Sequence, residues 1–170
     1  MILDEIALIC LLAMAEMVGA FGGNIPPQFD ERVGVCLEVA RAAENEELMV
    51  SIVVSVALEE SAFQRKLRSK AGAMGPLQII PRYHCPNAQG EHKPHERRGT
   101  LQGCDLVKDG VKAVGWFWRT YDHDWQRALA HYNSGTKIYN SSRAYARRVM
   151  RRSKRIERQL DAIMRAESTR

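Results

Sequence analysis

The chain has few cysteines, and it lacks both a basic leader and a long uninterrupted apolar run. Its 170 residues include only four cysteines, too few for a fold built on a disulfide scaffold. The apolar stretch 6–20 contains Glu16 and is shorter than the ~20 residues that a membrane-spanning helix requires. Asp4 and Glu5 precede it, and the first basic residue is Arg32, whereas a secretion signal carries positive charge before its apolar segment. The chain must therefore depend mainly on a hydrophobic core.

The length suits one domain, and the composition is that of an ordinary globular protein. Hydrophobic residues make up 45% and charged residues 26% of the sequence, with a formal net charge of +5. We interpret residues 1–24 as an apolar helix, buried or amphipathic, and leave open an atypical export or tethering role. Residues 28–166 are expected to form the main domain. The positive charge indicates an anionic partner without identifying it.

Helical periodicity dominates the rest of the chain, and no segment shows the sustained alternation of a half-buried strand. Asp30 is placed to cap the first of these helices, and residues 70–83 form a connection punctuated by Gly and Pro. Residues 84–104 are polar and are expected to be a surface loop. Together these features predict a compact, mostly α-helical domain. Further helices are expected over about 47–63, 106–121, 125–132 and 142–166.

Glu60 stands at the end of the most apolar of these helices. On a helix it falls on the stripe made by Met49, Val53 and Val56. A poorly solvated carboxyl favours its neutral form, so its pKa rises, as a general acid requires. Glu59 lies about 100° away around the helix and is the weaker candidate. Taken alone, the pattern also fits a charged helix end with no catalytic role.

A Gly-rich turn and an amide follow this helix. The turn, residues 71–75, contains Gly72 and Gly75, where the backbone can approach a bulky ligand closely. Gln78 offers both a donor and an acceptor, which suits the acetamido group of a sugar. The turn lacks the spacing of a phosphate-binding loop, and a purely structural turn remains an alternative.

Three segments in order resemble the catalytic domain of the soluble lytic transglycosylases, which share the goose-type lysozyme fold. The family pattern E-S-x-F matches residues 60–63, and S-x-x-G-A-x-G-x-x-Q-I-x-P matches 69–81. The pattern A-x-Y-N-x-G matches 130–135, and Tyr145 follows it. The resemblance covers roughly residues 48–150 and implies a compact lysozyme-like helical domain. The sequence departs modestly from the family pattern, most visibly at 76–77, where Pro-Leu replaces the usual Leu-Met.

The resemblance implies a role for each matched position. Glu60 matches the family's sole catalytic residue, and Ser69 and Gln78 match positions that contact the glycan. The remaining matches are expected to line the cleft near the acid. These are Tyr132, Asn133 and Tyr145.

The implied reaction cleaves the β-1,4 bond between N-acetylmuramic acid and N-acetylglucosamine in peptidoglycan. It leaves 1,6-anhydro-N-acetylmuramic acid ends and uses one glutamate as acid and base, with no metal or cofactor. Most glycosidases use two carboxylates, but substrate-assisted enzymes do not. A lysozyme-type hydrolase on the same fold and a non-catalytic, basic wall-binding protein are the alternatives. The implied location is the periplasm or cell envelope, reached by export or by delivery from a phage, as a virion component or endolysin.

The cysteines leave one pairing open. Cys85, His92, His95 and Cys104 match no zinc motif in their spacing, so we expect no metal there. Cys85 and Cys104 are expected to form a disulfide in an oxidising compartment and to remain thiols otherwise. The other two cysteines, Cys10 and Cys36, stand among apolar residues and are expected to be buried.

An aromatic cluster and a basic helix complete the pattern. We expect the cluster to belong to the core. We expect the helix to attract anionic cell-envelope polymers; without interleaved aromatics it does not indicate nucleic acid binding. We expect a monomer with no obligate protein partner. The cluster consists of Trp116, Phe117, Trp118, Tyr121 and Trp125, and the basic residues are Arg143, Arg147, Arg148, Arg151, Arg152, Lys154, Arg155 and Arg158.

Overall fold

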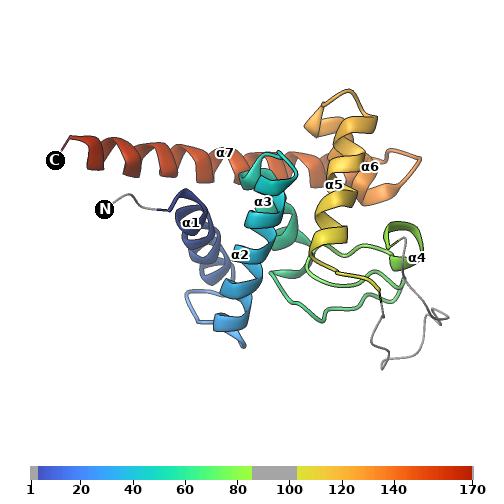
Figure 1. Cartoon of the computed structure of the whole chain (residues 1–170), viewed down its shortest axis with the longest axis horizontal. Coiled ribbons are helices and arrows are strands. Elements are labelled where there is room, and N and C mark those ends of the chain that lie inside the picture. The colour runs from blue at the N-terminus through green and yellow to red at the C-terminus, as the bar shows by residue number, and fades with distance from the viewer. Residues whose placement is uncertain (1–3, 86–102, 170) are drawn as a thin grey trace.

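The computed structural model describes residues 4–85 and 103–169, which form seven helices (Figure 1). Within these ranges there is no extended strand, only isolated bridges that pair Met74 with Arg68 and with Ile79. The prediction of a mostly α-helical domain is confirmed. The helices are α1 (Glu5–Ala20), α2 (Phe29–Asn45), α3 (Val50–Ser61), α4 (Pro81–His84), α5 (Lys108–Thr120), α6 (Trp125–Ser134) and α7 (Asn140–Ser168).

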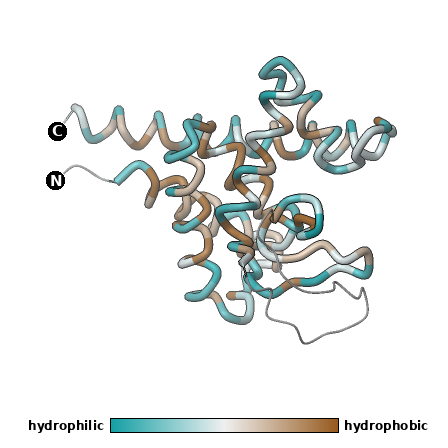
Figure 2. The backbone as a smooth tube through the Cα atoms, turned by 45° about the vertical axis from the view of Figure 1, so that its right-hand side comes forward, coloured by the Kyte–Doolittle hydropathy of each residue, from teal (hydrophilic) through white to brown (hydrophobic). Residues whose placement is uncertain are grey.

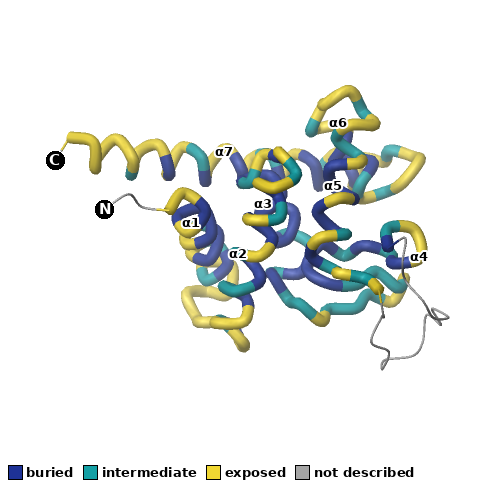
Figure 3. Tube along the Cα trace, in the orientation of Figure 1, coloured by how far each residue is buried: buried dark blue, intermediate teal, exposed yellow. Residues whose placement is uncertain are grey.

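The centre of the domain is α3. Every residue from 51 to 58 is buried, because α1, α2 and α7 pack around this helix (Figure 3). Val53 and Val56 are fully buried, as the apolar stripe predicts, but Met49 is 47% exposed because it precedes the helix. The central buried helix predicted from the sequence is therefore present and begins one residue after Met49.

The N-terminal helix α1 packs against α2, α3 and α7. Most of the segment that follows the N-terminus is hydrophobic, as the brown tube in Figure 2 shows. A disulfide between Cys10 and Cys36 joins α1 to α2, and both cysteines are buried as expected. In the described ranges no helix combines the length and hydrophobicity needed to cross a bilayer.

The prediction that Asp30 caps α2 is wrong. The helix begins at Phe29, the cap position is Gln28 in a left-handed conformation, and no side chain caps it. Asp30 instead lies in the first turn, where an acidic side chain is favourable to the helix dipole. Aspartates do cap α1 and α6: Asp4 accepts from the N–H of Ile6, and Asp124 accepts from two backbone N–H groups.

The connection between α3 and α4 is irregular and contains the isolated bridges of Met74. Ala62 and Phe63 both adopt left-handed backbone angles, which end α3 and reverse the chain. Phe63 is fully buried and fixes this turn in the core. Arg32 of α2, itself buried, donates hydrogen bonds to the carbonyls of Ala62 and Pro27. The turn that ends α3 is thus held by a side chain of α2.

The prediction that the aromatic cluster belongs to the core is only partly correct, because Trp118 and Trp125 pack against the core without being buried in it. Trp116 is 55% exposed, and the other four side chains are only half-buried. The rings also contact one another and neighbouring rings, with Trp118 stacked on Trp125 at 5.3 Å. The bulky face of α5 therefore covers the surface between α4 and α6 and does not point into the domain centre.

Candidate active site

The carboxyl of Glu60 is bound by a phenol from another helix. Tyr145, in the second turn of α7, donates a 2.7 Å hydrogen bond to Oε1 of Glu60, near the C-terminal end of α3. Tyr145 is only 3% exposed, whereas Glu60 is half-buried. The two residues are brought together because α7 packs directly on α3. The contact fixes one carboxyl oxygen and leaves the other without a hydrogen bond from the described residues.

Burial raises the pKa of Glu60 above its ordinary value of 4.5. The Tyr145 hydrogen bond acts in the opposite direction, because it stabilises the charged form, and the nearby charge of Glu59 raises the pKa further. The result favours a protonated Glu60. This is the electrostatic state that a general acid needs before the reaction.

A second buried phenol, that of Tyr132 on α6, lies in the electrostatic range of the same carboxyl. Its hydroxyl donates to the backbone carbonyl of Leu77, and its ring packs edge-on against Phe117. Burial, followed by the charge of Glu60, raises the pKa of Tyr132 well above its ordinary value, and the same is true of Tyr145. Both phenols therefore remain protonated hydrogen-bond donors at any ordinary pH.

The Gly-rich loop is attached to the end of α3 by Ser61. Its hydroxyl hydrogen-bonds to the carbonyls of Ala57 and Pro76, the latter at 2.8 Å. Together with the Tyr132 bond to Leu77, this contact holds the Pro76-Leu77 segment between α3 and α6. Sequence reasoning gave Ser61 no role of its own, although it is part of the E-S-x-F motif.

A second glycine, Gly110, allows α5 to approach this loop. A Cβ at Gly110 would lie 2.8 Å from Cδ1 and 3.0 Å from Cβ of Leu77, which is too close for any other residue. Leu77 is fully buried as a result. The departure of 76–77 from the family pattern is therefore accommodated by close packing.

The side chain of Gln78 braces the loop. Its amide nitrogen donates to the carbonyls of Leu67 and Gly75, at 3.1 and 2.9 Å. Both amide hydrogens are thereby used, so the carbonyl oxygen of this side chain is the atom left for a ligand. Ser69 has a related local role, since its hydroxyl accepts from the backbone N–H of Ala73. Neither residue contacts Glu60 directly.

Asn133 lies apart from this group of residues. It is exposed near the end of α6, and no contact among the described residues joins it to Glu60. The structure therefore brings Glu60 and Tyr145 into direct contact and places Gln78 on the adjoining loop, to which Tyr132 of α6 is bonded at Leu77. Ser69 lies at the far side of that loop.

The neighbouring acid, Glu59, has a different environment. Burial raises its pKa, but hydrogen bonds and charge from Arg148 and Arg152 outweigh that effect, so the net pKa is lowered. Arg148 donates at 2.7 Å and Arg152 at 2.9 Å to its two oxygens. Glu59 is thus a fixed carboxylate, and the two adjacent glutamates favour opposite protonation states. Sequence reasoning missed both arginines as partners.

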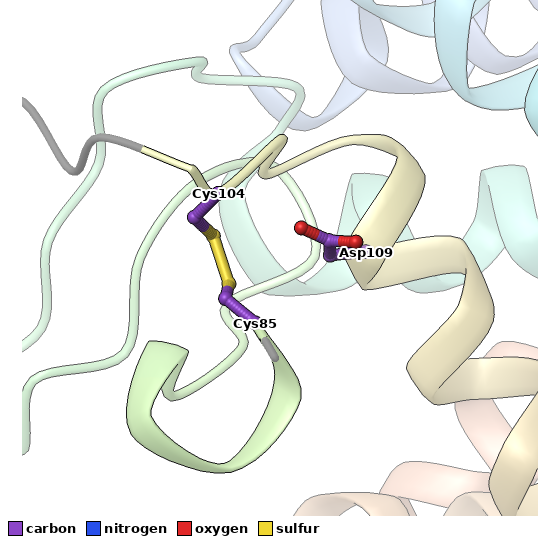
Figure 4. Close-up of side chains that lie close together, drawn as sticks. All are labelled: Cys85, Cys104 and Asp109. Atoms are coloured by element: carbon purple, nitrogen blue, oxygen red, sulfur yellow. A yellow bond between two sulfur atoms is a disulfide. The ribbon is translucent and has the colours of Figure 1, made fainter. Parts of the chain in front are cut away.

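The cysteines at the ends of the polar loop are bonded to each other. Figure 4 shows the Cys85–Cys104 disulfide, which joins the residue after α4 to the segment before α5, with Asp109 beside it. Bonded sulfurs are not thiolates and do not act as metal ligands in this state. His92 and His95, the other candidate ligands, lie outside the described residues.

A half-buried carboxyl with a raised pKa, carried by a mostly α-helical domain, is typical of the lysozyme-like enzymes that cleave glycans. The family profile described as the transglycosylase SLT domain matches residues 38–156, well over half of the chain. The chain therefore belongs to the SLT transglycosylase family and is a peptidoglycan lytic transglycosylase. No curated protein and no solved structure matches it.

Proposed function

We propose that this enzyme cleaves the β-1,4 bond between N-acetylmuramic acid and N-acetylglucosamine by single-carboxyl catalysis, with Glu60 as both acid and base. The observation that carries the proposal is that two adjacent glutamates have pKa values shifted in opposite directions. Burial raises the pKa of Glu60 and so favours its protonated form, whereas two arginines lower the pKa of Glu59 and favour its ionised form. One carboxyl is therefore available to exchange a proton, and its neighbour is committed to ion pairs.

In the first step Glu60 donates its proton to the glycosidic oxygen as the bond to the anomeric carbon breaks. The carbonyl oxygen of the muramic acid acetamido group attacks that carbon and forms an oxazolinium ring. Glu60 is left as a carboxylate, and the Tyr145 phenol stabilises it because this hydrogen bond strengthens as the acceptor becomes charged.

In the second step the Glu60 carboxylate removes the proton from the C6 hydroxyl. The C6 oxygen attacks the anomeric carbon, the oxazolinium ring opens, and the 1,6-anhydro product forms. Glu60 regains the proton that it gave up, so the cycle closes without water, metal or cofactor. The raised pKa of Glu60 supports this return of the proton.

Within this proposal Gln78 contacts the acetamido group through its carbonyl oxygen. The amide hydrogens of Gln78 already bind Leu67 and Gly75, so its oxygen is suited to accept the acetamido N–H. Ser69, Tyr132 and Asn133 are further proposed glycan contacts, on the resemblance to the family. Of these, Tyr132 has the ring best placed beside the acid, since its pKa responds to the charge of Glu60.

A substrate in the cell wall implies action in the cell envelope. The Cys10–Cys36 and Cys85–Cys104 disulfides support an oxidising compartment such as the periplasm. We propose that the enzyme acts there as a monomer, whether it is exported or delivered by a phage.

We also propose that the outer face of α7 binds anionic polymers of the envelope, although only part of the basic run is available. Arg148, Arg152 and Arg155 form ion pairs with Glu59 and Glu16. The other basic residues recur every three or four positions, and so they share one exposed face of the helix. We call this face the basic stripe; it consists of Arg143, Arg147, Arg151, Lys154 and Arg158.

The decisive experiment is mass spectrometry of murein digested by the wild-type enzyme and by Glu60→Gln. We expect anhydro ends as the only new ends from wild type, and at least a ~10²-fold loss of release from the variant. Glu59→Gln is the matched control, because it neutralises the adjacent carboxyl. Reducing N-acetylmuramic acid ends would show a hydrolase, and no release by wild type would favour a binding protein.

A further inference from the structure

A chain of ion pairs links the N-terminal helix to the residue beside the proposed acid. Arg152 lies between two carboxylates, at 3.1 Å from Glu16 of α1 and 2.9 Å from Glu59 of α3. Its third guanidinium contact is the backbone carbonyl of Ser55, in the turn before Glu59. The three charged side chains are only 16–21% exposed, so solvent screens them much less than a surface pair.

Arg152 is the central member of this chain. Arg148 also binds Glu59, but its side chain is 50% exposed, and an exposed pair of this kind contributes little on its own. Arg155 binds only Glu16 and is 52% exposed. Glu16 was an interruption in the apolar N-terminal stretch, and α1 lies outside the residues matched by the family profile.

We infer that Arg152 of α7, held in place by Glu16, is a positioning residue of the catalytic centre. It binds Glu59 of α3 as an ion-paired carboxylate and so leaves Glu60 as the carboxyl that exchanges the proton. The inference rests on the proposed function. It also makes α1 part of the catalytic unit, since the charge that orients Arg152 comes from that helix.

The charged and titratable groups around Glu60 come from its own helix and from four others. Glu59 is adjacent on α3, Tyr145 reaches it from α7, and Tyr132 lies on α6 within range of its charge. On the side of α2, Arg32 binds the Ala62 carbonyl two residues further along the chain. On the side of α1 the facing charge is that of Glu16, which Arg152 and Arg155 neutralise.

The sign of each effect follows from these charges. The negative charge of Glu59 raises the pKa of Glu60, so Glu59→Gln lowers that pKa. Arg152→Met leaves Glu59 ionised near neutral pH but removes the cation beside it, so the pKa of Glu60 rises further. A general acid must be protonated in the free enzyme, and kcat/KM therefore falls as pH rises through the pKa of Glu60.

The test is the pH profile of kcat/KM with a short soluble glycan, followed by release of anhydro product. We expect the alkaline limb to move to lower pH in Glu59→Gln and to higher pH in Arg152→Met. The double variant should return close to wild type, because both charges of the pair are then absent. Arg152→Lys should keep the wild-type profile, since it retains the charge.

Arg155→Met is the matched control. It removes an ion pair with Glu16 from the same helix but leaves both partners of Glu59 in place, so its profile should match wild type. Glu59→Gln alone keeps the test decisive if Arg152→Met does not fold.

Two outcomes would overturn the inference. One is anhydro product from every variant with no movement of the alkaline limb. The other is a shift of the alkaline limb of kcat/KM in the same direction in Glu59→Gln and in Arg152→Met. Failure of the proposed function is distinct, because wild type would then form no anhydro product.

Discussion

The phenol of Tyr145 and the carboxyl of Glu60 are 85 residues apart in sequence and share a 2.7 Å hydrogen bond. The proposed acid is thus oriented by the long C-terminal helix and not by the helix that carries it. Because Tyr145 is buried and its pKa is raised well above the ordinary value, it acts only as a donor. This one contact connects the orientation of the acid with its proton affinity.

Tyr145→Phe removes that donor with little change in shape. The hydrogen bond lowers the pKa of Glu60, so its loss raises that pKa and moves the alkaline limb of kcat/KM to higher pH. We also expect kcat to fall about 10²-fold, because the carboxylate formed in the first step loses its partner. Stopped assays across a pH series measure both effects. An alkaline limb that stays in place or moves to lower pH would contradict the assigned role of Tyr145.

Glu60→Gln should make the folded state more stable at high pH. The raised pKa of Glu60 means that the folded protein binds this proton more tightly than the unfolded chain does. The resulting stability is fully present below the ordinary value of 4.5 and is lost as pH rises through the raised, folded-state pKa. A glutamine at this position does not titrate, so the variant loses no stability in this way as pH rises. Thermal unfolding of both proteins over a pH series should show Tm values that coincide at low pH and separate in favour of the variant above it.

Gln78→Ala should reduce both activity and stability. The carbonyls of Leu67 and Gly75 lose this donor but each keeps a backbone one, the N–H of Gly75 and that of Gln78 respectively, so the cost is about 0.5–1.5 kcal/mol for each bond lost. We expect kcat to fall about 10²-fold with a smaller change in KM. Gln78→Gly is the control for backbone strain, since Gln78 has a φ of 48° that glycine adopts without cost. A Tm equal to that of wild type in the alanine variant would show that Gln78 does not brace the loop.

Removal of the Cys85–Cys104 disulfide should destabilise the domain. The bond closes a loop with a sequence separation of 19, for which the restriction of the unfolded chain corresponds to about 3 kcal/mol. Urea unfolding of Cys85→Ser/Cys104→Ser should show a fall of that order in the free energy of unfolding. A reductant should then have less effect on the variant than on wild type. Equal unfolding free energies for the oxidised and reduced wild-type protein would exclude a stabilising role for both disulfides.

Neutralising the basic stripe should weaken attachment to the wall without slowing the chemistry. Arg147 and Arg151 are exposed and form no ion pair within the described ranges, so Arg147→Gln/Arg151→Gln should leave the Tm unchanged. Binding to murein sacculi should fall most at low salt, where screening is weakest. Cleavage of a short soluble glycan should stay near wild type.

A matched control distinguishes the effect of the basic stripe on binding from the effect of overall net charge. Arg119→Gln/Arg127→Gln removes the same charge from exposed arginines on α5 and α6. Equal losses of sacculus binding in both double variants would show that overall charge, and not the outer face of α7, governs attachment.

Local patterns in the sequence were sufficient to predict the helical fold and the environment of Glu60. The apolar run of α3 indicated burial, and the carboxyl at its end is indeed poorly solvated. The same patterns gave no information about partners distant in sequence. Arg152 meets Glu59 at a separation of 93 residues and Glu16 at 136, and these pairs depend on how α1, α3 and α7 pack. In the sequence Arg152 was one of several basic residues of the last helix, and no local pattern distinguished it from the others.

The prediction for the aromatic cluster was only partly correct, for a related reason. Spacing on a helix shows which side chains share a face but not what that face contacts. On α5 the smaller residues Val111 and Val114 enter the core, and the larger Trp116 is left at the surface. Gly110 favours this orientation, because it permits close contact with Leu77.

The continuity of α7 has a mechanical consequence. Its 29 residues contain neither glycine nor proline, and its last turns extend beyond the neighbouring helices (Figures 1 and 3). Tyr145 and the basic stripe are therefore parts of one rigid rod, with about 20 Å along its axis between Tyr145 and Arg158. A polymer held by the stripe would meet the proposed acid at a constant spacing, because the helix has no hinge between them. The geometry of attachment would then select which bond along a strand comes within reach of Glu60.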